Sequence, residues 1–271
     1  MFRKMFKFKH IILFFLLTAI APAASAARGN DVSEILSRAD SAYNAKDYRS
    51  ALSLYNSVRE TDGASPELLH NIGNASFRLG DNGRAVLAYE RALRLDPSYT
   101  DARASLDYVN STIKGLPDDG TTFLSNINNS ILNLFSPDGW AKTALILFFV
   151  ILGCAALYLF ASNVALRKTG FFGGIVILFV FIYSLILAFR SASAINDHSE
   201  AVVVAQGSKL STKPVSDPSK TDKTGIVPPG AKLNVTDSVN TPEDQTTKVW
   251  YKIRLSNGNE AWISGADVEF I

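Results

Sequence analysis

The chain is poor in the residues that build metal and redox sites. It has one cysteine and three histidines among 271 residues. One cysteine excludes an internal disulfide, and three histidines are too few for a histidine metal cluster. Cys154 lies inside an apolar run, where cysteine behaves as a small buried hydrophobe rather than as a thiol catalyst or metal ligand. We therefore expect neither a metal nor another cofactor.

Charge is also scarce and balanced. The chain has 27 Lys and Arg residues against 25 Asp and Glu residues, and its net charge is +2. No basic cluster is present, so a nucleic-acid partner is not expected. The sequence also lacks the patterns G-x-x-x-x-G-K-[ST], H-E-x-x-H and G-x-S-x-G, which mark phosphate-binding loops, zinc proteases and serine hydrolases. These absences predict a protein that is not an enzyme.

Apolar residues, in contrast, are concentrated in three runs. The first, IILFFLLTAIA, follows Arg3, Lys4 and Lys7 and precedes Ala24-Ser25-Ala26, which fits the small-residue rule for signal cleavage. The sequence predicts a signal peptide over residues 1–26, cleaved after Ala26. An uncleaved N-terminal anchor is the alternative.

The other two runs are long enough to cross a membrane. Thr143 to Ser162 and Phe171 to Phe189 contain no Asp, Glu, Lys or Arg, and a helix rising 1.5 Å per residue crosses the bilayer core of about 30 Å with about 20 residues. We expect transmembrane helices over residues 141–162 and 171–190. Their lack of ionisable residues argues against an ion or proton path.

The short loop between these runs, NVALRKTG, predicts the orientation. It holds Arg167 and Lys168, and positive charge in a short loop favours the cytoplasm. Both flanking soluble parts would then lie in the periplasm, and the protein in the inner membrane. Before the hairpin, Phe123, Ile127 and Ile131 recur four residues apart, which predicts an amphipathic helix on the membrane surface over residues 121–135. Packing of that helix against the soluble domain is the alternative.

A repeat lies near the N-terminus. Ala51 and Ala85, like Tyr55 and Tyr89, are 34 residues apart, and this period resembles the tetratricopeptide repeat. We expect an all-α repeat domain over residues 31–115, with two repeats and a capping helix. Small residues would lie where paired helices touch, aromatic ones at the contact with the next repeat, and a proline after the second helix. The repeat-packing positions are Ala51, Tyr55, Gly73, Ala85, Tyr89, Ala92 and Pro97.

The functional interpretation of such repeats is a concave, peptide-binding groove. The groove-facing offsets of the repeat are occupied by Asp40, Tyr43, His70, Asn71, Asn74, Phe77 and Tyr108. The asparagine amides would bond an extended peptide backbone, and none of Asn71, Asn74 and Phe77 lies at a helix-packing offset of the repeat. His70 alone is more typical of a surface histidine than of a ligand. A helical hairpin domain without a groove is the alternative.

Short alternating segments divided by turn residues follow after Arg190. In KVWYKIRL the side chains of Val249, Tyr251 and Ile253 share one face, and an SNGN turn leads to EAWI. The sequence predicts an all-β barrel of about five strands over residues 200–271. It resembles the bacterial SH3-like domain, whose pattern Trp250, Gly258 and Trp262 match.

In the SH3-like domain, we expect Trp262 to lie in the core rather than at a contact, and the polar stretch from Gly207 to Thr224 to form a loop. The resemblance implies binding of cell-wall peptides or of proteins.

The order of these parts resembles the BatE group of the Bacteroides aerotolerance (Bat) family. The phrases NLFSPDGW (Asn133 to Trp140) and GNASFRLGD strengthen the resemblance, which covers the whole chain. It implies a Bacteroidetes inner-membrane protein in a complex with other Bat proteins, including von Willebrand factor A-domain members, and indirectly with a MoxR-type ATPase. The complex would be linked to aerotolerance or to envelope stress.

Three functional hypotheses follow. The first is a membrane-anchored adaptor that assembles a protein complex through its repeat groove and SH3-like domain. The second is an envelope sensor that binds peptidoglycan through the SH3-like domain. The third is a chaperone-like factor for exported proteins.

Overall fold

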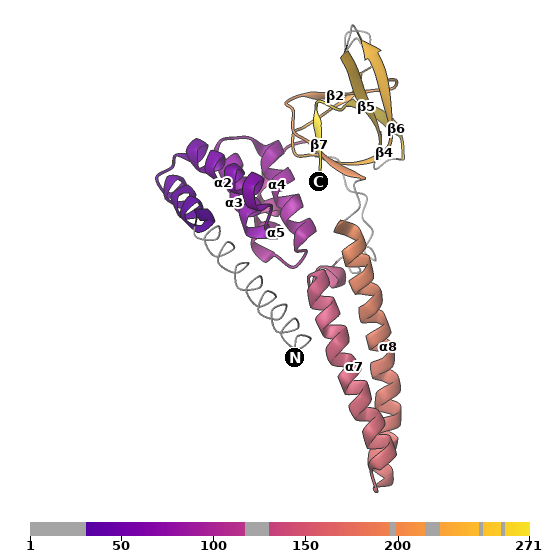
Figure 1. Ribbon diagram of the computed structural model, residues 1–271. Helices are drawn as coiled ribbons and strands as arrows, with labels where there is room; N and C mark the ends of the chain where they lie inside the picture. Colours follow the sequence, from indigo (N-terminus) through magenta and orange to yellow (C-terminus); the bar gives the residue numbers. More distant parts are fainter. Residues whose placement is uncertain (1–30, 117–129, 196–198, 215–222, 244–245, 256–257) are drawn as a thin grey trace, which may run out of the picture. The chain divides into compact units, whose positions relative to one another are not determined.

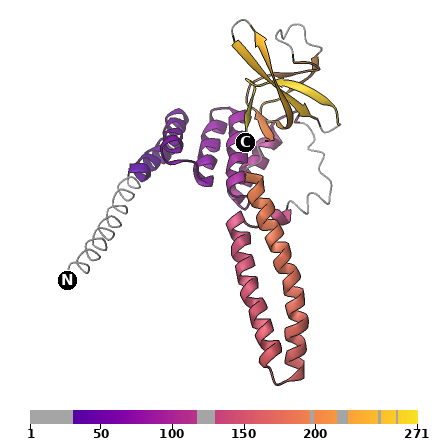
Figure 2. The ribbon, with the colours of Figure 1, turned by 45° about the vertical axis from the view of Figure 1, so that its right-hand side comes forward.

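The structure is a computed structural model that describes residues 31–116, 130–195, 199–214, 223–243, 246–255 and 258–271 (Figures 1 and 2). The predicted signal peptide lies outside the described residues, as does most of the predicted interfacial helix. The chain divides into two compact units between Ala64 and Ser65. We describe each unit by itself.

The first unit is a helical hairpin. Residues 31–44 form one helix and α2 (Tyr48–Asp62) the other. The Asp47 carboxylate caps α2 by accepting a hydrogen bond from the Ser50 N–H, which satisfies one of the free donors of the first turn. Ala39, Ala51, Tyr55 and Val58 are buried.

The second unit begins with three helices: α3 (Pro66–Arg78), α4 (Asn82–Leu95) and α5 (Thr100–Thr112). Ser65 caps α3 and Asp81 caps α4, and Asp81 is 34 residues after Asp47, the α2 cap. Helix α4 packs against both α3 and α5. Gly73 of α3 lies against the ring of Tyr89, so closely that a Cβ at Gly73 would be 2.5 Å from a ring carbon.

Two long helices, α7 (Pro137–Phe160) and α8 (Val164–Ile195), form the next part and pack side by side (Figures 1 and 2). Both are long and apolar enough to cross a membrane, and the most apolar segment of each has a mean hydropathy of 2.6 in α7 and 2.7 in α8. Only 6% and 11% of these two segments are buried inside the structure. A core helix of a soluble protein would be covered by other parts of the chain, whereas these apolar surfaces are mostly exposed.

The turn of this hairpin is shorter than the sequence predicted. The N–H of Ala165 donates to the Asn163 side chain, and this cap starts α8 at Val164. Arg167 and Lys168 therefore lie in the first turns of α8 and not in a loop. Glycine allows the helices to approach: a Cβ at Gly170 would lie 2.8 Å from the main-chain oxygen of Cys154.

The C-terminal part is one antiparallel sheet with strand order β3-β2-β6-β5-β4-β1-β7. The strands are β1 (Glu200–Val203), β2 (Ser208–Ser211), β3 (Lys223–Val227), β4 (Lys232–Glu243), β5 (Thr246–Arg254), β6 (Glu260–Ser264) and β7 (Val268–Phe270). The sheet curves into a half-barrel, as expected of an SH3-like domain. Its core contains Val203, Leu233, Ile253, Ala261 and Ile263.

The sequence underestimated the number of strands in this domain. About five were expected, and the described residues contain seven. The stretch from Gly207 to Thr224, expected to be a loop, contains β2 and the start of β3, which pair with each other. Both segments are rich in Lys, Ser and Thr and show little apolar alternation, so the main-chain ladder forms them rather than a side-chain pattern.

Candidate functional site

The exposed face of α3 and α5 in the second unit carries an aromatic pair. The ring of Phe77 on α3 meets the ring of Tyr108 on α5 edge-on, with 5.7 Å between ring centroids. Tyr108 is 62% exposed, and Leu79, which follows the last residue of α3, is 42% exposed. Exposed aromatic rings held by each other offer an apolar contact at a small cost in side-chain entropy.

Next to this pair lies a polar cluster around His70. The Nε2 atom of His70 is 3.0 Å from the hydroxyl of Ser105 and 3.4 Å from the amide nitrogen of Asn74, and its Nδ1 atom is 3.4 Å from the hydroxyl of Tyr99. Burial lowers the pKa of His70, and the Asp101 carboxylate acts in the opposite direction. His70 is thus half-buried between α3 and α5 rather than a free surface histidine.

The Ser105–His70 pair does not make a hydrolase site. Ser105 lies inside α5, where main-chain N–H groups are used by the helix, so they cannot form an oxyanion hole for a tetrahedral intermediate. No group of three or more His, Cys, Asp or Glu side chains suited to a metal ion occurs among the described residues. Among the described residues, the groups that this cluster offers to a ligand are hydrogen-bond donors and acceptors.

Two predicted groove residues, Asp40 and Asn74, accept hydrogen bonds from tyrosines of their own repeats. The hydroxyl of Tyr89 donates to Asn74 at 2.7 Å, and that of Tyr55 donates to Asp40 at 2.6 Å. These bonds are equivalent, because both partners are 34 residues apart in the sequence. The expectation that Asn74 takes no part in helix packing was wrong: its side chain ties α3 to α4.

The remaining groove positions are distributed over the two units. Tyr43 of the first unit packs edge-on against Tyr48, with 5.2 Å between ring centroids. In the second unit, Asn71 is half-buried on α3 and Phe77 and Tyr108 form the aromatic pair. Four predicted groove residues thus lie together on α3 and α5 of the second unit: His70, Asn74, Phe77 and Tyr108.

In the sheet, the two tryptophans lie on the face opposite the core residues of β6. Ala261 and Ile263 are buried in the core, so alternation turns the half-buried Trp262 away from it. The expectation of a core Trp262 was therefore wrong. Trp250 shares this face through the β5–β6 register but is buried, and its Nε1 has no hydrogen-bond partner among the described residues. Gly258 has a positive φ of 83° that favours glycine.

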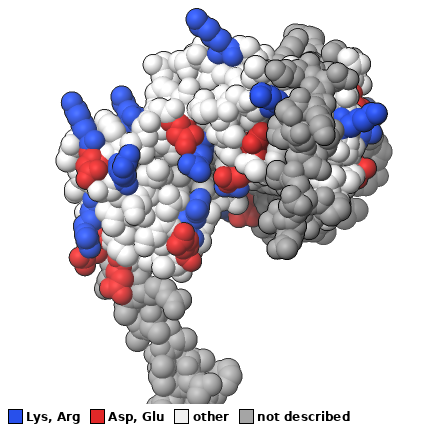
Figure 3. Space-filling view, turned by 90° about the horizontal axis from the view of Figure 1, so that it is seen from above, with Lys and Arg blue, Asp and Glu red and all other residues white. Residues whose placement is uncertain are grey.

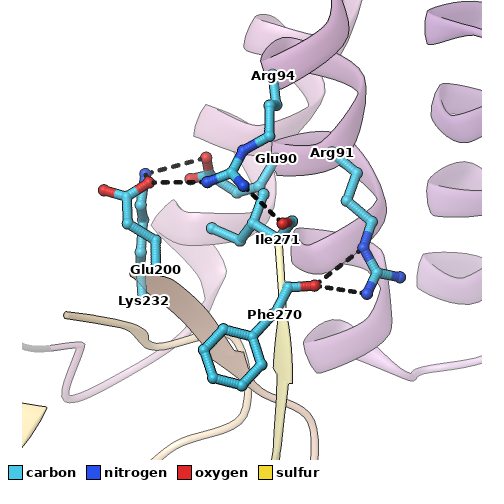
Figure 4. Close-up of polar contacts among 7 residues, drawn as sticks. All are labelled: Glu90, Arg91, Arg94, Glu200, Lys232, Phe270 and Ile271. Atoms are coloured by element: carbon cyan, nitrogen blue, oxygen red, sulfur yellow. Dashed lines mark hydrogen bonds and ion pairs between the residues drawn. The ribbon is translucent and has the colours of Figure 1, made fainter. Parts of the chain in front are cut away.

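An additional contact, between α4 and the sheet, has no signal in the sequence. Figure 4 shows its polar members: Glu90, Arg91 and Arg94 of α4 meet Glu200, Lys232, Phe270 and Ile271. Burial acts to lower the pKa of Lys232, but the carboxylates of Glu90 and Glu200 more than offset it and the pKa is raised. Elsewhere, in the face seen in Figure 3, described cations and anions are interspersed.

Comparison with known families assigns both soluble modules. The tetratricopeptide repeat model matches residues 66–99, the second predicted repeat, and the bacterial SH3 domain model matches residues 216–269. No curated protein matches the chain. The chain thus combines a helical repeat, two apolar helices and an SH3-like sheet. Tetratricopeptide and SH3 modules are typically non-catalytic and bind proteins, and bacterial SH3 modules bind peptidoglycan in some cases.

Proposed function

We propose that the protein is a non-enzymatic, membrane-anchored adaptor that binds a protein partner through the exposed face of α3 and α5. The observation that carries the proposal is the Phe77–Tyr108 pair beside the His70 cluster, within a chain that also holds two membrane-length helices. An extended peptide would place an apolar side chain on the pair and its backbone against polar groups of the cluster.

The cellular setting comes from the sequence. We propose an inner-membrane protein of the Bat type, with both soluble parts in the periplasm, that assembles an envelope complex with other Bat proteins linked to aerotolerance or envelope stress. The contact between α4 and the sheet supports one element of this topology: it joins segments before and after the hairpin, which therefore need to lie on the same side of the membrane.

Affinity capture from solubilised membranes tests the adaptor. The variant Asn71→Ala/Phe77→Ala/Tyr108→Ala should lose the partners that the parent chain recovers, because a few central residues carry most of the binding energy of such a face. Asn74 is left unchanged because it holds Tyr89. The control is Asp107→Ala, an exposed neighbour on α5. Recovery of the same partners by a triple variant with a native circular dichroism melt would refute the proposed site.

The topology has its own test. Cysteines at Ser33 or Lys209, in a Cys154→Ser background, should react with an impermeant thiol reagent in spheroplasts, and a cysteine at Thr169 should not. The reverse pattern would place the soluble parts in the cytoplasm.

A second candidate is a peptidoglycan-binding sensor. It is favoured by the half-buried Trp262 on the face away from the core, since an aromatic ring that carries an N–H donor suits sugar and peptide ligands. Sedimentation of the full chain in detergent with insoluble cell wall, compared with Trp262→Ala, distinguishes the two. Equal sedimentation of both proteins would exclude this face.

A further inference from the structure

The contact between α4 and the SH3-like sheet contains a row of alternating charges. The Lys232 Nζ atom is 3.3 Å from a Glu90 carboxylate oxygen and 3.0 Å from one of Glu200, and a guanidinium nitrogen of Arg94 is 3.7 Å from that Glu200 oxygen. Glu90 and Arg94 are one helical turn apart on α4, and Glu200 and Lys232 come from the adjacent strands β1 and β4. Each charge therefore faces an opposite charge across the contact.

Arginines also bond the main chain at the end of the sheet. Arg91 donates through Nε (3.1 Å) and Nη2 (2.5 Å) to the main-chain oxygen of Phe270, and Arg94 donates to that of Ile271 at 2.7 Å (Figure 4). Phe270 is the last residue of β7, an outermost strand of the sheet, and Ile271 follows it. Main-chain oxygens at a sheet edge lack a neighbouring strand to donate to them. Hydrogen bonds from a charged guanidinium are stronger than those between neutral groups, so the two arginines are effective partners.

Close backbone packing accompanies the charges. A Cβ on Gly83 of α4 would lie 2.8 Å from the main-chain oxygen of Val203 and 2.9 Å from the Cα of Val204. A Cβ on Gly230 would lie 2.6 Å from Ile113 and 3.2 Å from Val86. The side chain of Leu116, just after α5, packs partly against the core of the sheet. The contact therefore has an apolar floor and a charged rim.

We propose that this contact is an intramolecular latch that couples the SH3-like sheet to the repeat helices through α4. Helix α4 serves both modules: Glu90, Arg91 and Arg94 hold the sheet, while the adjacent Tyr89 holds Asn74 on α3. Loss of the latch loosens α4 and, through Tyr89, the α3 helix. The proposal bears on the binding face proposed above, but its test requires no partner.

Zero-length cross-linking of the full chain in detergent tests the latch. A water-soluble carbodiimide activates a carboxylate as an acylisourea; the Lys232 amine attacks its carbonyl carbon, an amide forms, and a urea leaves with the oxygen. Lys232 can link to Glu90 only when the sheet is docked, whereas its link to Glu200 forms within the sheet and serves as the internal control. Mass spectrometry of the digest identifies both links.

The latch predicts both links in the parent chain. In Arg91→Gln/Arg94→Gln the yield of the Lys232–Glu90 link should fall by about tenfold or more, because the charge-assisted contacts of both arginines with the sheet are lost. The Lys232–Glu200 link should persist. The matched control is Arg84→Gln, also on α4, whose guanidinium pairs with Asp81 away from the contact. Lys232→Arg should abolish both links while keeping the charge.

Hydrogen–deuterium exchange of the same proteins tests the coupling. Peptides of α3 and α4 should exchange faster in Arg91→Gln/Arg94→Gln than in the parent or in Arg84→Gln. A Lys232–Glu200 link without a Lys232–Glu90 link in the parent would overturn the latch. Unchanged exchange in α3, in a variant that has lost the Lys232–Glu90 link, would overturn the coupling. Neither outcome depends on the adaptor function.

Discussion

The variant Gly83→Ala tests whether α4 is docked on the sheet, because the docked and undocked arrangements predict stability changes of opposite sign. Gly83 is the second residue of α4 and is buried. In a helix that faces solvent, Gly→Ala is stabilising by up to about 1 kcal/mol, because alanine has the higher helix propensity. In the structure, the added methyl group would lie 2.8 and 2.9 Å from backbone atoms of Val203 and Val204.

The steric effect outweighs the helix propensity. Overpacking typically costs about 1–3 kcal/mol, and main chain cannot rotate away as the end of a side chain can. We therefore expect Gly83→Ala to destabilise the docked state by about 1–2 kcal/mol, the balance of these two effects. In a unit of this size, that lowers the melting temperature by about 2–8 °C. If the sheet undocks before it unfolds, the melt should instead separate into two transitions.

The assay is calorimetry of the full chain in detergent, together with the yield of the Lys232–Glu90 link. The control is Gly173→Ala in α8, where an added Cβ meets nothing within 4 Å. A Gly83→Ala protein that melts at or above the parent temperature, with the link unchanged, would refute the reasoning, because only a solvent-facing Gly83 gives that sign.

The remaining predictions concern local contacts. Burial lowers the pKa of His70 below its value in the unfolded chain, so the unfolded chain binds the proton more readily. The stability of the folded state should therefore fall as the pH drops through about 6.5. Thermal melts of His70→Gln should show a weaker pH dependence than those of the parent. Gly170→Ala should weaken the α7–α8 pair by about 1–3 kcal/mol, since its Cβ would meet main-chain atoms of α7, whereas Gly173→Ala should be neutral in the same detergent melt. Asp81→Ala should destabilise α4 by about 1 kcal/mol, measured by denaturant titration, because the carboxylate caps the Arg84 N–H.

Elements with a strong local signal were predictable from the sequence. The 34-residue period located the second repeat, which the family comparison matches, and the uncharged runs located two helices of membrane length. The apolar alternation in KVWYKIRL placed Ile253 in the core of the sheet. In each case the side chains themselves carry the periodicity of the structure.

Contacts between distant segments were not predictable in this way. Glu90 and Lys232 are 142 residues apart, and neither belongs to a pattern, because a single ion pair has no period. The short strands β2 (SKLS) and β3 (KTGIV) likewise lack a repeated apolar alternation, and the three residues of β7 are too few to show a period. Tyr89 and Asn74 did have a signal: their offset recurs in Tyr55 and Asp40, but only the structure shows that the side chains bond.

The latch bears on whether the two soluble modules lie on the same side of the membrane, which is a separate question from which side that is. Contact between α4 and the sheet requires an even number of membrane crossings between them, and α7 and α8 are two helices of membrane length between these segments. This holds whether or not the N-terminal apolar run is cleaved, since that run precedes both modules. The side of the membrane, in contrast, rests on the positive charges of Arg167 and Lys168 at the start of α8. Charge variants at these two residues can therefore invert the hairpin while the latch is retained.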